Sequence, residues 1–353
     1  MFLAFKEIKH EKLRYALITA MILMISYLIF ILTSLALGLA NENTSGIYSW
    51  NFKHIILNAD ANTSLSQSLL TANQISAQKI TNKEALIGQA SVVVKKAASS
   101  NVDANFVGIK SNQFIYKDLQ LSLGHLPKND QQIVVDSSFR NSGYHLNDWV
   151  TLNSNTKKYQ IVGFVKNAQY NMSPIIYGRL TAWSSLKNVS PTFKASAIIS
   201  RKNYYTAKTK KTASYSTNSL IQKLPGYSAQ NTTFSLMIAF LLIISLIIVT
   251  VFLYIITIQK IPNYAVLRAQ GIPASILVKS TISQAISLVG AGLTLGIFFT
   301  WITTVFIPKS APMSFNIPLL SLVALSLIVT SILGTLLPIK AILHVDPITI
   351  IGG

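Results

Sequence analysis

The chain has 353 residues, of which half are hydrophobic and only 12% are charged, and its formal net charge is +19. Soluble globular proteins carry about 25% charged residues, so this composition excludes an ordinary soluble protein and indicates long stretches in lipid. The sequence has no cysteine, which excludes disulfides, thiolate metal sites and a cysteine nucleophile.

Four long stretches without charge predict four transmembrane helices, because roughly 20 apolar residues span a bilayer. Gly292 and Gly296, in the third, have a spacing that allows close helix packing, although both could be ordinary small residues. The expected segments are a cytoplasmic amphipathic helix (1–14), transmembrane helix 1 (15–41), an extracellular domain (42–223), transmembrane helix 2 (224–259), a cytoplasmic coupling segment (260–279), transmembrane helix 3 (280–308), a short outer loop (309–316), transmembrane helix 4 (317–339) and a cytoplasmic C-terminus (340–353).

The short loops indicate the orientation in the membrane. Lysine and arginine accumulate in short cytoplasmic loops. Basic residues precede the first span (Lys6, Lys9, Lys12 and Arg14), and Lys260, Arg268 and Lys279 lie between the second and third spans. We therefore expect a multi-pass protein of the plasma membrane, with both termini cytoplasmic and the large domain extracellular.

The segment between the first two spans is long enough for one domain. Its first part, 58–79, indicates a loop followed by a helix, and its later part contains short β-like runs at 131–135, 149–152, 158–165 and 173–177. The predicted fold class is an α-helical polytopic membrane protein with an α+β extracellular domain, helical early and sheet-rich late. Most of the excess positive charge lies in this domain, which is expected outside the cell. We therefore reject a nucleic-acid partner.

The sequence gives little support to catalysis. The five histidines show no metal-ligand spacing, and there is no GxSxG motif. No GxxxxGK[ST] sequence is present, so the expectation is that the chain is not an enzyme and that a partner hydrolyses ATP. Gradient-driven transporters use acidic residues in their transmembrane helices as ion or proton sites. No Asp or Glu occurs between Asp148 and Asp346, so a proton-coupled mechanism is disfavoured.

Three stretches carry a resemblance to a known family. They are Gly124–Val135 with Asn147–Val150 and Tyr159–Val165, then Thr257–Ile272, and finally His344–Gly353. Together with the order of spans and domain, they resemble the FtsX/MacB-type permeases of ABC transporters over the whole chain. Gln132 and Asn147 depart from the family's usual Glu and Gly.

Within that family, Leu3–Lys9, Leu35–Asn43 and Asp346–Gly353 look most like the haem-exporting Hrt permeases of Gram-positive bacteria. The resemblance implies a permease homodimer in membrane lipid and two cytoplasmic ABC ATPase subunits that bind ATP and Mg. It implies no intrinsic cofactor, and haem as the transported ligand.

The coupling segment is the expected contact for the ATPase. Pro262 is expected to open a short helix that Tyr264 continues and Gly271 stops, which would give a rigid element able to transmit a push. Leu267 and Arg268 are the candidate contacts. The alternative is that they only cap and solubilise the connection.

A haem site needs apolar walls, polar groups and one or two iron ligands. Glu42, at the outer end of the first span, and Met313, in the short outer loop, are the candidate iron ligands, and Tyr170 and Tyr227 are candidates for stacking or ligation. Alternatively, Glu42 caps a helix and Met313 fills a gap. Two other functions also remain open: export of antimicrobial peptides or other amphiphiles, and an FtsX-like signal relay to a cell-wall hydrolase.

Overall fold

A computed structural model describes residues 11–97, 99–153, 156–308 and 311–344. The expected helix at 1–14 and the closing motif from Asp346 therefore lie largely or wholly outside the described residues. The chain divides into two compact units, which we name the helical unit (Met1–Leu37 and Thr232–Gly353) and the domain unit (Gly38–Asn231).

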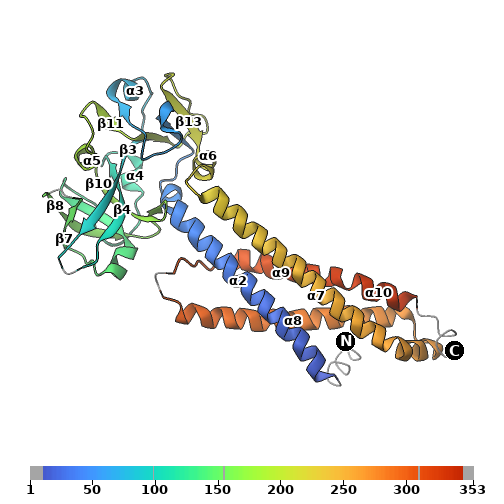
Figure 1. The fold of residues 1–353 in the computed structure, drawn as a ribbon. Helices are drawn as coiled ribbons and strands as arrows, with labels where there is room; N and C mark the ends of the chain where they lie inside the picture. The colour runs from blue at the N-terminus through green and yellow to red at the C-terminus, as the bar shows by residue number, and fades with distance from the viewer. Residues whose placement is uncertain (1–10, 98, 154–155, 309–310, 345–353) are drawn as a thin grey trace. The chain divides into compact units, whose positions relative to one another are not determined.

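The described part of the chain has four helical stretches long and apolar enough to cross a membrane. The helices that form them are α2 (Lys12–Ser49), α7 (Tyr227–Ala269), α8 (Ala274–Phe306), α9 (Ile317–Gly334) and α10 (Leu336–Leu343) (Figure 1). α2 and α7 are longer than the expected spans and continue into the domain unit. At the start of α9 the Asn316 side chain accepts a hydrogen bond from the backbone N–H of Leu319 at 3.2 Å, which caps the helix.

Glycines on α8 allow it to approach α2 closely. A Cβ atom added to Gly292 would lie 2.6 Å from Ile22 Cγ2, and one added to Gly296 would collide with the Ser26 side chain. The Ser26 hydroxyl also donates to the Gly292 carbonyl at 3.4 Å. The small-residue spacing predicted for close packing therefore serves the contact between α2 and α8 within one chain.

The prediction that a short helix begins at Pro262 is wrong. Pro262 lies inside α7, which continues without interruption to Ala269. Proline inside a helix removes one backbone hydrogen bond, but helices in membranes tolerate this because neighbouring groups satisfy the freed carbonyl. Gly271, at φ 86°, then takes the left-handed conformation and leads into α8.

The domain unit is built on a sheet of eleven strands in its described residues, with the order β13-β1-β12-β3-β4-β10-β6-β8-β5; β7 pairs with β3 and β8, β9 pairs with β10, and β11 pairs with β2 in a separate ribbon. The strands are β1 (His54–Asn58), β2 (Leu70–Thr71), β3 (Glu84–Lys95), β4 (Val102–Ile109), β5 (Leu121–Gly124), β6 (Gln132–Asp136), β7 (Trp149–Leu152), β8 (Lys158–Val165), β9 (Gln169–Tyr170), β10 (Ser173–Arg179), β11 (Phe193–Ala195), β12 (Ala197–Ser200) and β13 (Thr212–Ser216). Short helices connect them: η1 (Ala59–Ala61), α3 (Ala72–Ser76), α4 (Phe114–Lys117), η2 (Ser137–Ser142), α5 (Leu180–Lys187) and α6 (Thr217–Gln222).

The α+β class of this unit is as predicted, but the helix-early, sheet-late order is wrong. β3 and β4, the longest pair of strands, lie in its first half. Both faces of β3 are covered, since Ala85 and Ile87 join one hydrophobic core while Ala90 and Val92 join another. Strands buried on both faces lack the apolar–polar alternation that reveals a strand in sequence.

Three glycines lie side by side across neighbouring strands of this sheet. Gly88 of β3 pairs with Gly108 of β4, which pairs with Gly178 of β10. A Cβ atom on Gly88 would enter the Trp183 ring of α5, and one on Gly108 would lie 3.0 Å from the Leu180 Cα. Gly88 and Gly108 therefore let α5 pack directly on the backbone of the sheet, and Gly178 makes room for the Phe106 ring.

Candidate functional site

Glu42 lies in the part of α2 that belongs to the domain unit, and it is partly exposed. Its backbone carbonyl accepts a hydrogen bond from the N–H of Met172 at 3.1 Å, and the carbonyl of Asn43 accepts one from Asn171 at 3.1 Å. These bonds join the helix to the turn between β9 and β10. The structure thus brings the backbones of Glu42 and Met172 together.

Met172 is a residue that the sequence analysis did not single out. It follows Asn171 in a two-residue hairpin loop, and both residues are left-handed, with φ 59° and 51°. This loop type favours glycine at its second position, and a left-handed conformation costs a side chain about 1–2 kcal/mol. Met172 occupies that position with 51% of its surface exposed. Such strained residues gather at functional sites.

Tyr170 and Tyr227 both belong to the packing of the domain unit. Tyr170 is buried with its ring centroid 6.3 Å from that of Trp50, and burial raises the pKa of Tyr170 to about 12. A neutral, buried phenol is a poor iron ligand. Tyr227, at the start of α7, is partly buried against the same hydrophobic core. The structure places both residues as packing groups of this core, and Tyr170 directly precedes the turn that contacts Glu42.

Met313 belongs to the helical unit. Its backbone N–H donates to the Ala311 carbonyl at 2.8 Å, and the N–H of the next residue, Ser314, donates to the Ser34 carbonyl of α2 at 3.0 Å. The side chain is half-buried. Met313 is therefore held close to α2, whereas Glu42, Met172, Tyr170 and Tyr227 belong to the domain unit.

The expected coupling residues differ in their access to a partner. Tyr264 is only 3% exposed and packs against Leu277 of α8 and Ile342 of α10, and Leu267 is half-buried on the same cluster. Pro262 and Gly271 are exposed, and Arg268 is half-buried. Two apolar residues that the sequence analysis did not name, Val266 and Ile276, are well exposed beside the α7–α8 connection.

A polar cluster joins α2, α7 and α8 close to that connection. The Lys260 amine donates to the Tyr15 hydroxyl at 3.2 Å and lies 5.6 Å from the centroid of the Tyr15 ring. The same hydroxyl donates to Gln284 Oε1 at 3.4 Å. Lys260 is buried, so its ammonium group is stabilised by the tyrosine ring and hydroxyl. The cluster ties the first span to the two helices that meet at the connection.

Residues 235–347, which contain most of α7 and all of α8, α9 and α10, match the family model described as the FtsX-like permease C-terminal domain. The chain carries an FtsX-like permease domain. The whole chain is also similar to two curated proteins, both provisionally named hemin transport system permease protein HrtB. The protein from Staphylococcus haemolyticus is 28% identical over 353 residues, and the one from Staphylococcus epidermidis is 26% identical over 352, with 99% of each chain covered in both cases.

Two solved structures resemble about half of the permease. The periplasmic region of MacB from Actinobacillus actinomycetemcomitans is 16% identical, with a TM-score of 0.36, over 48% of this chain and 91% of that one. The extracellular domain of the noncanonic ABC-type transporter YknZ from Gram-positive bacteria is 12% identical, with a TM-score of 0.33, over 47% and 98%. Neither similarity bears on what the permease binds.

Proposed function

We propose that this chain is the permease subunit of an ABC exporter that takes haem from the outer leaflet of the membrane and expels it outward. ATP hydrolysis in a partner subunit drives the step. The observation that supports this most strongly is the similarity, over nearly the whole length of both chains, to proteins named for hemin transport. The FtsX-like domain supports the role of a permease rather than of an ATPase.

The proposed assembly has two permease chains and two cytoplasmic ATPase subunits, which bind the ATP and Mg. Both permease termini face the cytoplasm, and the domain unit faces outward. The basic residues near the α7–α8 connection, Lys260, Arg268 and Lys279, support this orientation by the positive-inside rule. The exposed Val266 and Ile276, with Arg268, are the proposed surface for the ATPase.

α7 is the proposed relay. Its 43 residues form one helix from Tyr227 to Ala269, so it is about 65 Å long at 1.5 Å per residue. A continuous helix transmits a displacement applied at one end to the other. ATP-driven movement at the α7–α8 connection would therefore reach the first residues of α7, which belong to the domain unit.

Glu42 is the proposed carboxylate ligand of the haem iron, with a methionine as the second ligand. Met172 is supported by its backbone bond to Glu42, and Met313 by its place in the outer loop. A carboxylate and a thioether are weak iron ligands compared with histidine, which suits a cargo that has to be released. Tyr170 and Tyr227 are proposed to shape the wall of the site.

The experiment is haem titration of the permease purified with its neighbouring ATPase, following haem absorbance and haem-stimulated ATP hydrolysis. Glu42→Ala should abolish the absorption band, and Met172→Ala and Met313→Ala identify the thioether. Met24→Ala, which truncates an exposed methionine elsewhere on α2, is the control and should leave the band unchanged.

ATP hydrolysis that does not respond to haem would overturn the proposal. Response to cationic antimicrobial peptides instead would point to a peptide exporter. If deletion of the gene leaves cells insensitive to haem but defective in division, a relay to a cell-wall hydrolase would be favoured.

A further inference from the structure

The domain unit contains an open groove with a volume of about 930 Å³, whose lining residues include neither Glu42 nor Met172. It is lined by α3 and the turn after it, by β3, by the end of β4 and the loop that follows it, by the turn at Asp130, by the end of β10 and the start of α5, and by residues 191–194. Ligand pockets typically have volumes of about 300–1,000 Å³. The groove is therefore large enough for a molecule of several fused rings.

The floor of the groove is apolar and rigid. Ile75, Leu86, Leu180 and Trp183 line it, and Ile80 stands at its edge with 37% of its surface exposed. The Trp183 indole is fixed because its Nε1 donates to the Gln89 carbonyl at 2.9 Å. An apolar surface of this kind in water favours an apolar occupant.

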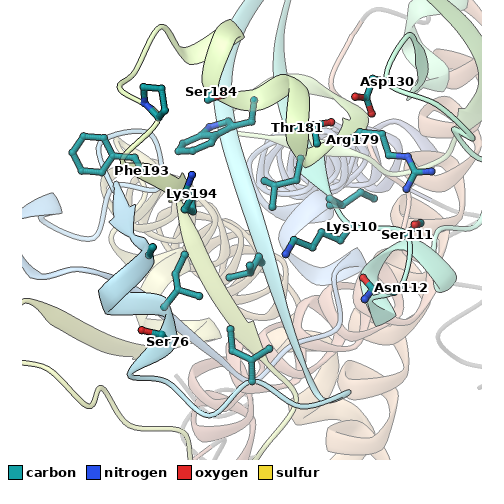
Figure 2. Close-up of a pocket in the computed structure, with 18 of the residues that line it drawn as sticks. Ser76, Lys110, Ser111, Asn112, Asp130, Arg179, Thr181, Ser184, Phe193 and Lys194 are labelled. Carbon is teal, nitrogen blue, oxygen red and sulfur yellow. The ribbon is translucent and has the colours of Figure 1, made fainter.

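Lysine and arginine side chains line the sides of the groove. Figure 2 shows Lys110 reaching into the hollow from one side and Lys194 standing on the other. Arg179, near Lys110, is engaged: its Nη2 donates to the Lys128 carbonyl at 2.8 Å, and its guanidinium lies 5.9 Å from the Tyr116 ring centroid. Asp130 is the single acid among the lining residues. The two exposed lysines therefore make the groove attractive to anions.

The lining residues include no histidine, methionine, tyrosine or cysteine. The groove thus offers no customary ligand for haem iron, although its floor and its two lysines suit a flat apolar body with two carboxylates. A cationic peptide would face the lysines unfavourably, so the charge of the groove selects against that class of occupant.

We propose that this groove binds a porphyrin dicarboxylate through its ring and its two carboxylates, independently of the metal. The choice of a porphyrin as the flat dianion rests on the proposed function. The groove would be a second, metal-independent site for the cargo, whereas the Glu42 site holds the iron. Ring contact with the apolar floor supplies most of the affinity, and Lys110 and Lys194 each bind one carboxylate.

The test is titration of the full-length permease, in nanodiscs of neutral phosphatidylcholine, with metal-free protoporphyrin IX, followed by porphyrin fluorescence and by tryptophan quenching. The double variant Lys110→Glu/Lys194→Glu should weaken binding by about tenfold or more, since two charge-assisted contacts become repulsive. Ile80→Asn should weaken it less. The dimethyl ester of the same porphyrin should bind the unaltered protein weakly.

The matched control is Lys208→Glu/Lys210→Glu, which changes the net charge of the same unit equally through two exposed lysines outside the groove. It should change the affinity by less than about twofold. Thermal melting of each variant checks that the domain unit stays folded.

Equal affinities in the two double variants, or no binding of protoporphyrin IX to the unaltered permease, would overturn the groove site. Glu42→Ala should leave binding of the metal-free porphyrin unchanged, and a loss there would also overturn it. These outcomes are independent of haem-stimulated ATP hydrolysis, so failure of the groove and failure of the proposed export function can be told apart.

Discussion

The two units of the permease bury a charged side chain in different ways. Glu84 of the domain unit, 1% exposed, accepts hydrogen bonds from the Thr81 backbone and hydroxyl at 2.8 and 2.6 Å and from the Ser200 hydroxyl at 2.8 Å, and pairs with Lys202 at 3.0 Å. Lys260 of the helical unit contacts the hydroxyl and the ring of Tyr15. The glutamate is held by bonds from two segments, one at Thr81 and one at Ser200 and Lys202, all within the domain unit. The lysine instead links α7 to α2 through the Tyr15 side chain.

The largest effect is expected at Glu84. Glu84→Ala removes the acceptor for two donors of Thr81 and for the buried Ser200 hydroxyl, and it removes the partner of Lys202, so the free energy of unfolding of the domain unit should fall by about 3 kcal/mol. Thermal or denaturant melting of the purified permease measures this. Asp103→Ala, which removes an exposed carboxylate of β4, is the control and should shift stability by less than about 0.5 kcal/mol. Equal effects of the two substitutions would contradict the anchoring role.

The next largest effect on stability is expected where α2 and α8 pack closely. Gly292→Leu places a side chain against Ile22, and overpacking of this kind costs about 1–3 kcal/mol. Gly290→Leu is the control on the same helix, because a Cβ there meets no atom within 4 Å. Melting of both variants in nanodiscs should separate them clearly. A destabilised Gly290→Leu with an unaffected Gly292→Leu would refute this packing.

Stability of the domain unit should also depend on pH. Burial raises the pKa of Glu84, but the hydrogen bonds from Thr81, Lys202 and Ser200 outweigh it and hold the pKa below its ordinary value of 4.5. A carboxylate with a lowered folded pKa stabilises the protein above the unfolded pKa and loses that contribution as pH falls through the folded pKa. Melting temperature should therefore drop below about pH 4.5. Glu84→Gln should reduce that drop, and an unchanged slope would exclude the glutamate as its source.

Substitution of Tyr15 is expected to have the smallest effect on stability but a clear effect on haem-stimulated ATP hydrolysis. Tyr15→Phe keeps the ring and removes the hydroxyl that contacts Lys260 and Gln284, so stability should change by about 1 kcal/mol or less. Haem-stimulated ATP hydrolysis should fall. Tyr27→Phe removes a comparable bond between α2 and α8, from the Tyr27 hydroxyl to Thr303 at 2.9 Å, and is the control. Similar loss of stimulation in both variants would show that the Lys260 cluster has no special role.

The sequence was most informative where hydrophobic patterns were simple. The four apolar stretches and the strand Trp149–Leu152 were identified because length and alternation report directly on lipid and on half-buried strands. The strand Lys158–Val165, which is covered on both faces, was identified only because turn residues bound it. β3 and β4 were missed because a strand covered on both faces shows no alternation. Pro262 was misread because a proline in lipid need not end a helix.

Site residues were harder to predict, because exposure and contacts depend on the whole fold. Tyr264 looked available in the sequence but packs between helices, while Val266 and Ile276, ordinary apolar residues of the chain, are exposed. Met172 became visible as a neighbour of Glu42 only through a backbone hydrogen bond to a helix 130 positions earlier. Local patterns contain no information on such distant contacts.

Gly88 and Gly108 let α5, whose first residues line the groove, pack directly on the backbone of the sheet. The frame of the groove therefore depends on the main chain, while its chemistry depends on wall residues such as Lys110 and Lys194. Those residues are exposed and can be substituted one at a time without disturbing the packing of α5 on the sheet. An arrangement of this kind lets selectivity diverge among descendants, or be redesigned in the laboratory, while the scaffold stays the same.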